Sequence, residues 1–222
     1  MSWIKKNPTR QECDEMDRKA YRKNNYSFYL KKGETRSILF VDDSFCSVFV
    51  HGMRVGGKWS EFTCRSGHPD GKPCEFCAYS EIARYRKSFC TILDLTGYTK
   101  KDGEEVKGYR TLLGLKSKAS KKWMFQKEES GGLVGKIFRV HRNEDKTSTA
   151  TGDTEVFVKD VDLEDKKYWP LKDGTPVRPE AIKYEEVLEP ETYDEQRAIM
   201  SRVNGASQTF EYNEQSDDDV PY

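Results

Sequence analysis

The chain has no apolar run approaching the roughly 20 residues that a membrane-spanning helix needs, so we expect no membrane partner. Residues 1–6 do not open an apolar signal segment. We therefore expect a cytoplasmic chain whose cysteines are not paired in disulfides. The sequence also shows no internal repeat. Together these absences favour one domain with extended ends, for which 222 residues suffice.

The chain also lacks a formal net charge, but its charges are unevenly spread. Residues 1–36 carry +5 and residues 84–142 carry +9, whereas residues 143–222 carry −12. A basic body joined to an acidic end indicates a polyanionic partner and a tail that competes with it or binds something else. The simpler alternative is that solvated charged faces happen to be segregated along the chain.

One short stretch concentrates the residues that can bind a metal, with the spacing His-x12-Cys-x9-Cys-x2-Cys. The four residues are His51, Cys64, Cys74 and Cys77. A structural zinc site takes four such ligands in a tetrahedron, and a Cys-x2-Cys pair supplies two of them from one tight turn. Buried thiols or a redox pair are the alternatives, but a redox Cys-x2-Cys needs a βαβ context that is missing here. We therefore predict one structural Zn²⁺.

The fourth ligand is open to two readings. His51 directly follows the apolar run 46–50, whereas His68 lies in the loop before the Cys-x2-Cys turn. We prefer His51, because structural metals usually join separate elements. Cys46 and Cys90 lie in strand-like runs and are predicted to be small core residues, and Cys13 has no evident role.

The pattern of apolar residues predicts a mainly β (α+β) protein built on a small barrel of the oligonucleotide/oligosaccharide-binding (OB-fold) kind. Strands are expected at 36–50 with a break at 42–44, and at 58–64, 89–95, 108–115, 135–142 and 155–161. Helices are expected near 11–23, 78–86 and 118–128. The predicted organisation is a basic N-terminal arm at 1–35, an OB-fold core at 36–165 with a zinc loop at 51–77, a Pro-rich acidic extension at 166–202, and a disordered acidic tail at 203–222.

Aromatic residues alternate with basic ones through the middle of the chain. Cations that follow phosphates and rings that stack on unpaired bases together bind single-stranded nucleic acid. Any single aromatic is more often a core residue, so the prediction rests on the combination. The candidate nucleic-acid contacts are Lys58, Trp59, Tyr79, Arg84, Tyr85, Arg86, Lys87, Tyr98, Tyr109, Arg110, Lys116, Lys118, Lys121, Lys122 and Trp123.

The metal motif and the order of the parts resemble the phage single-stranded DNA-binding proteins, whose T-even members carry the same ligand spacing. The acidic tip is similar to that of bacterial single-stranded DNA-binding proteins, with Val220 and Tyr222 standing where those have Ile and Phe. The tip consists of Asp217, Asp218, Asp219, Val220, Pro221 and Tyr222. The resemblance implies a DNA-coating protein of an infected bacterial cell that acts in replication, recombination and repair. It also implies self-association on DNA and replication or recombination partners that bind the tip.

Two other classes of function stay open. Pro-Cys-x-x-Cys at 73–77 matches half of a zinc deaminase signature, but the general acid/base Glu expected two residues after the His is Met53. A duplex-DNA regulator would show a recognition helix or half-site symmetry, and nothing reads clearly as either. We therefore expect no enzyme.

Overall fold

The computed structural model describes residues 27–99, 105–106, 108–172 and 175–205. The helix expected near 11–23 and the acidic tip at 217–222 lie outside these residues. The strands are β1 (Thr35–Phe40), β2 (Cys46–Val55), β3 (Lys58–Thr63), β4 (Ala83–Asp94), β5 (Tyr98–Thr99), β6 (Glu105–Val106), β7 (Tyr109–Lys116), β8 (Lys136–His141), β9 (Thr154–Asp160), β10 (Leu171–Lys172) and β11 (Thr175–Pro176). The helices are the 3-10 turns η1 (Glu75–Ala78) and η2 (Lys166–Tyr168), and α2 (Ser117–Glu129), α3 (Tyr184–Val187) and α4 (Tyr193–Gly205).

The expected strands are present, and the helix expected at 118–128 is α2, but the helix expected at 78–86 is wrong. Only the short turn η1 forms there, and residues from Ala83 onward enter the twelve-residue strand β4. Pairing with β2 along residues 83–89 decides the conformation of this segment. Tertiary pairing thus overrides a local helical preference, as it often does for short segments.

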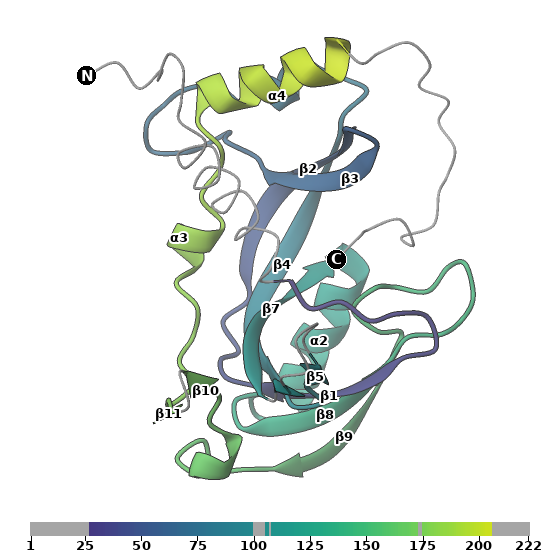
Figure 1. The fold of residues 1–222 in the computed structure, drawn as a ribbon, viewed down its shortest axis with the longest axis vertical. Helices are drawn as coiled ribbons and strands as arrows, with labels where there is room; N and C mark the ends of the chain where they lie inside the picture. The colour runs from purple at the N-terminus through teal and green to yellow at the C-terminus, as the bar shows by residue number, and fades with distance from the viewer. Residues whose placement is uncertain (1–26, 100–104, 107, 173–174, 206–222) are drawn as a thin grey trace.

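The main sheet is antiparallel, with the order β3-β2-β4-β1-β8-β9 and with β7 on the other edge of β4. The long strand β4 organises the sheet. Its first half pairs with β2, its last residues pair with β1, and β7 runs along 87–94. Figure 1 shows β2, β3 and the first part of β4 reaching beyond the end of β7 toward α4, whereas β1, β7, β8 and β9 lie at the other end, around α2.

The curved part encloses the main core, but strand pairing does not close it into a barrel within the described residues. The two edges, β7 and β9, do not pair with each other. Residues 28–30 instead bond to β7 and to the loop that precedes β9. The Phe28 amide donates to the Leu112 carbonyl at 2.7 Å, and the Leu30 amide donates to the Ala150 carbonyl at 2.8 Å. The molecule is therefore mainly β with few helices, and its sheet is open.

Aromatic side chains fill the core between the curved sheet and α2. The Trp123 ring lies 4.9 Å from the Phe40 ring and 5.0 Å from the Phe138 ring, centre to centre. Trp123 is 4% exposed, so it anchors α2 to the sheet. A fully buried Trp contributes several kcal/mol, roughly 3–5 by comparison with truncations elsewhere.

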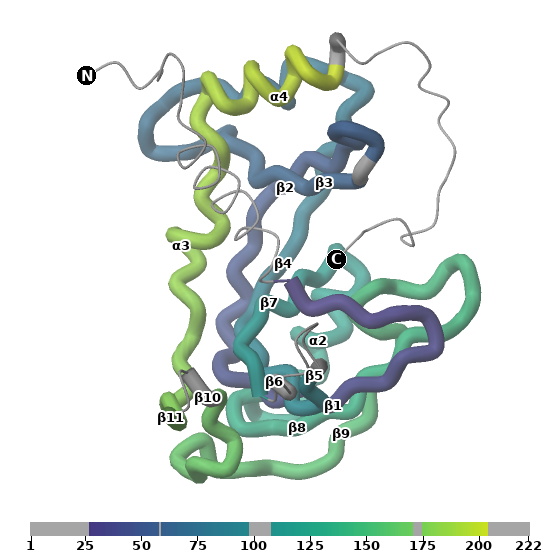
Figure 2. Tube along the Cα trace, viewed as in Figure 1, coloured from purple at the N-terminus to yellow at the C-terminus, as the bar shows by residue number. Residues whose placement is uncertain are grey.

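Residues 177–205 pack along the outside of the sheet. We call residues 177–192 the strap (Figure 2). Its Ile182 is buried against Phe89 and Leu112. The hydroxyl of its Tyr184 donates to Asp42 at 2.7 Å. The strap leads to α4, which contacts η1 and β2 at the far end of the molecule. The region expected as an acidic extension therefore contributes buried residues to two clusters.

Candidate metal centre and the surrounding surface

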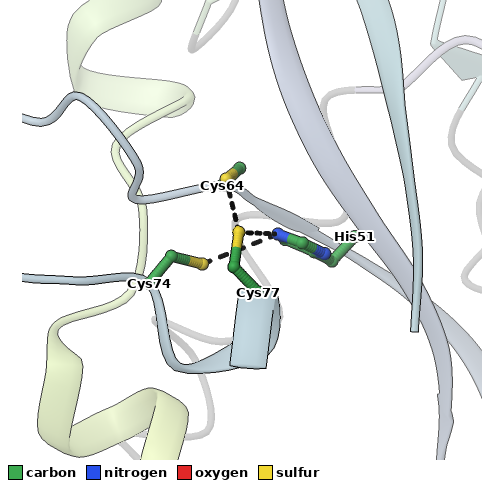
Figure 3. Close-up of side chains that lie close together, drawn as sticks. All are labelled: His51, Cys64, Cys74 and Cys77. Carbon is green, nitrogen blue, oxygen red and sulfur yellow. Dashed lines mark hydrogen bonds between the residues drawn. The ribbon is translucent and has the colours of Figure 1, made fainter. Parts of the chain in front are cut away.

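The four ligand candidates come from three elements that converge at one end of the sheet (Figure 3). His51 lies in the middle of β2, and Cys64 follows the end of β3. Pairing between these strands fixes both positions, and the Cys64 amide also donates to the Phe49 carbonyl at 2.8 Å. Cys74 immediately precedes η1 and Cys77 lies within it, and the Cys77 amide donates to the Cys74 carbonyl at 3.2 Å.

The ligand atoms of His51, Cys64, Cys74 and Cys77 all lie within 4.8 Å of one another, and the group could hold a metal ion. His51 Nε2 is 3.6 Å from the Cys74 sulfur and 3.4 Å from the Cys77 sulfur. The sulfurs of Cys64 and Cys77 are 3.6 Å apart. A disulfide needs about 2.05 Å, so these two thiols are not bonded to each other. The five cysteines of the described residues are all free.

The alternative ligand, His68, is not part of this group. Its Nδ1 bonds to Asp70 Oδ1 at 2.9 Å, within the loop before the Cys-x2-Cys turn. That loop turns at Gly71, whose φ of 68° is a conformation that favours glycine. The structure therefore supports His51 over His68 as the fourth member.

The pKa values of the Cys74 and Cys77 thiols are shifted in opposite directions. Burial raises the pKa of Cys74, but hydrogen bonds from His51 and from backbone amides outweigh it, so that the pKa is lowered. Burial together with the sulfurs of Cys64 and Cys74 raises the pKa of Cys77. One thiol thus ionises at the expense of its neighbour, because like charges at this distance repel. A bound divalent cation would stabilise all the thiolates together.

A hydrophobic shell closes the inner side of the centre. The Phe76 ring is fully buried, with its centre 5.7 Å from the His51 ring and 5.2 Å from the Phe62 ring. Met200 of α4 is buried in the same cluster. Gln196 of α4 is also fully buried, and its Oε1 accepts the Glu75 amide at 2.9 Å. We call the metal centre together with the cluster around Phe76 and Met200 the metal lobe. Helix α4, which the sequence analysis did not connect with the metal loop, is therefore part of this lobe.

Strand register divides the nucleic-acid candidates between the two faces of the β2–β4 pair, because residues directly opposite each other share a face. Phe49 pairs with Arg86, and His51 pairs with Arg84. We call the face that carries Ser47, Phe49, Arg84 and Arg86 the open face. It lies between the metal centre at His51 and the core at Cys90, which follows on the same face of β4.

Phe49 is the residue of the open face that sequence reasoning missed. Its side chain is 49% exposed. The Arg84 guanidinium lies 4.3 Å from its ring centre. An aromatic residue this exposed in the middle of a ten-residue strand is unusual, because such rings normally pack in the core. In the sequence, Phe49 lies within the apolar run 46–50, and nothing there distinguishes it from Val50, which the structure buries.

The other face of the pair carries Trp59, Tyr85, Lys87 and Lys116. We call it the strap face, because the strap packs against it at Val48 and Phe89. Glu61 lies among these residues. Its carboxylate accepts hydrogen bonds of 2.5 Å from both the Tyr85 hydroxyl and Lys87 Nζ. Lys116 Nζ lies 5.5 Å from the Tyr85 ring centre.

Other candidates have structural roles. Trp123 is buried in the core, so it has no ring face open to a base, and we remove it from the list. The Tyr109 hydroxyl donates to Asp94 at 2.9 Å, and Tyr79 packs in the lobe around Phe76. Arg110 donates to the Glu180 carbonyl at 3.0 Å. The side chains of Lys58 and Tyr98 lie outside the described residues.

Of the three candidate lysines on α2, two are exposed on its outer surface and one is paired with an acidic residue. Lys118 and Lys121 are exposed, three residues apart on the outer surface of the helix, and Phe125 continues this stripe with 62% of its side chain exposed. Lys122 instead pairs with Glu155 and donates to the Asp153 carbonyl at 3.1 Å. The helix thus presents a short basic and aromatic ridge next to the end of β7.

In comparisons with known proteins, no family model matches the chain and no curated protein matches its sequence. Among the described helices, none is long and apolar enough to span a membrane.

Proposed function

We propose that the protein binds single-stranded DNA on its open face, without catalysis, and that one Zn²⁺ stabilises the lobe beside this face. The observation that carries the proposal is the arrangement of Phe49 with Arg84 and Arg86. A half-exposed ring beside two cations on a rigid pair of strands is the combination that stacks on a base and holds its phosphates.

The geometry of the metal centre supports zinc. Bond lengths of about 2.3 Å to sulfur and 2.0–2.1 Å to nitrogen give a tetrahedron with edges of about 3.8 Å between sulfurs and about 3.6 Å between sulfur and nitrogen. The separations of 3.4–3.6 Å around Cys77 and His51 fit a slightly contracted version of that tetrahedron. Three sulfurs and one imidazole nitrogen are also donors that zinc prefers.

The donor set supports a structural role over a catalytic one. Four protein ligands fill a tetrahedron, whereas catalytic zinc keeps one position for water. Met53, where a zinc deaminase has its Glu, is 7% exposed and packs against Phe76. The thioether of a methionine has no proton to transfer, so the position at which a zinc deaminase needs its general acid/base cannot serve that role here.

The curved sheet supports an OB-fold relationship as part of the proposal. Antiparallel strands curve around one core into which α2 packs through Trp123, and residues 28–30 bond to β7 and to the loop before β9, near the edges that strand pairing leaves open. Partly open five-stranded barrels of this class bind oligonucleotides on a strand face. The open face, which continues from the core toward the metal centre, would be that surface here.

The proposal extends to DNA coating in phage replication, recombination and repair, and to self-association and partner binding through the acidic tip. These parts rest on the charge pattern and on the resemblance of the sequence. The duplex-DNA regulator remains the alternative that an experiment must separate from it.

Titration of fluorescent oligonucleotides at several salt concentrations tests the proposal. Single strands should bind better than a duplex of the same length. Phe49→Ala should weaken binding about fivefold or more, because one base–aromatic stack contributes roughly 1–3 kcal/mol. Phe157→Ala is the matched control, since Phe157 is 46% exposed but lies on β9. A duplex preference, or equal effects of the two variants, would contradict the proposal.

A further inference from the structure

Part of β4 extends beyond the end of β7 and forms an edge of the main sheet in the described part of the chain. Pairing between β7 and β4 begins at Lys116 and Lys87. The preceding residues 83–86 pair with β2 on one side, and no described strand pairs with their other side. Figure 1 shows this part of β4 rising past β7 toward α4. A ligand on the open face can therefore reach the strap face by crossing a single strand.

Side chains that bind nucleic acid lie on both sides of that edge. Because side chains alternate along a strand, Arg84 and Arg86 belong to the open face, and Tyr85 and Lys87 belong to the strap face. Lys116 extends the second set, with its ammonium group 5.5 Å from the Tyr85 ring centre. The edge thus carries cations toward both faces of the sheet.

Trp59 gives the strap face a flat aromatic platform. A Cβ on Gly52 would lie 2.3 Å from the Trp59 ring, so the ring rests directly on the backbone of β2. Only glycine permits this approach. Trp59 is nevertheless 38% exposed, so one side of the indole is packed and part of it remains accessible. A ring held in this way loses little freedom when a base stacks on it.

The one acidic group among these residues is already neutralised. Glu61 bonds to the Lys87 ammonium and to the Tyr85 hydroxyl, and its pKa is lowered because the attraction and bonds of Lys87 outweigh the opposing effect of burial. Its charge is therefore matched locally and fixes the Tyr85 ring in place. The strap limits this contact surface on the side of Val48 and Phe89, because its exposed Glu185 and Glu186 would repel phosphates.

We propose that a single strand of nucleic acid bound on the open face crosses the β4 edge at 83–86 and continues over Tyr85 and Trp59 on the strap face. This inference rests on the proposed function, because it extends the same bound strand. It assigns a second contact surface for a single-stranded polyanion and predicts that the binding site is longer than one face can hold.

Oligothymidylates of two lengths test the path. Site sizes on such folds run from about 4 to 16 nucleotides, so a strand of about 5 should occupy the open face alone and one of about 16 should reach both faces. Trp59→Ala should weaken binding of the long strand about fivefold or more and leave the short strand unchanged. Phe49→Ala should weaken binding of both lengths.

Trp59→Phe is the conservative variant and should restore most of the affinity for the long strand, because it keeps a ring on Gly52. Thermal unfolding of Trp59→Ala should match that of the wild-type protein, which would separate a lost contact from a lost fold. If Trp59→Ala leaves both lengths unaffected while Phe49→Ala weakens both, the path is wrong and the proposed function stands. If Phe49→Ala weakens neither, the proposed function fails, and the path that extends it fails too.

Discussion

Met200→Ala tests whether α4 is an integral part of the metal lobe. Met200 is 3% exposed and lies in the cluster with Met53, Cys74 and Phe76. Replacing a buried Met by Ala costs roughly 2–5 kcal/mol, depending on how far the site can collapse. The helix lies on the outside of the lobe, with the half-buried Ile199 and Val203 beside the new cavity. Partial closure is therefore feasible, and we expect about 2–3 kcal/mol.

The loss should appear as weaker metal retention as well as lower stability. Cys74 belongs to the same cluster as Met200, so a loosened α4 leaves the Cys-x2-Cys turn less well ordered. Metal that binds only the folded lobe is released more readily when the lobe opens more often. The measurements are urea unfolding and the rate of metal transfer to a chromophoric chelator. Both should change in the same variant.

Ser201→Ala is the control on the same helix. Ser201 is exposed, and its hydroxyl donates to the Arg197 carbonyl at 3.0 Å within α4. An exposed helical Ser→Ala change should alter the free energy of unfolding by less than about 0.5 kcal/mol. If Met200→Ala behaves like this control in both assays, α4 is not a structural part of the lobe, and our account of the C-terminal region is wrong.

Three further predictions concern the metal, the core and the strap face. Cys77→Ser should lower metal content by elemental analysis together with the melting temperature, whereas Cys46→Ser, at a half-buried thiol outside the cluster, should leave metal content unchanged. Trp123→Ala should destabilise the protein by roughly 3–5 kcal/mol in denaturant unfolding, and a stable variant with impaired DNA binding would contradict its place in the core. Glu61 has a lowered pKa, so its contribution to stability is complete above its unfolded-state value of 4.5 and is lost as the pH falls through the lower folded value. Glu61→Gln should therefore flatten the acid side of the stability profile, and an unchanged acid side would refute the ion pair with Lys87.

Local pattern predicted much of the secondary structure. Alternating apolar residues and Gly-rich turns indicated β3, β7, β8 and β9 within about two residues, and the basic segment after Lys116 indicated α2. Such features depend on neighbours in the sequence, so periodicity is enough to find them. The segment 83–86 is the exception, because its strand conformation depends on pairing with a partner more than thirty residues away in the chain.

The sequence by itself identified Cys64, Cys74 and Cys77 as members of the candidate metal centre, because a Cys-x2-Cys pair with a further cysteine nearby is typical of structural zinc sites. It favoured His51 over His68 as the fourth member, and only the structure brought His51 and not His68 into the group. Only the tertiary structure decided which face each basic and aromatic side chain occupies, because a one-residue change of register would exchange the two faces. It also decided that Phe49 is exposed while Trp123 is buried, and that α4 closes the metal lobe. Each of these facts depends on contacts between segments far apart in the chain, and no local pattern records them.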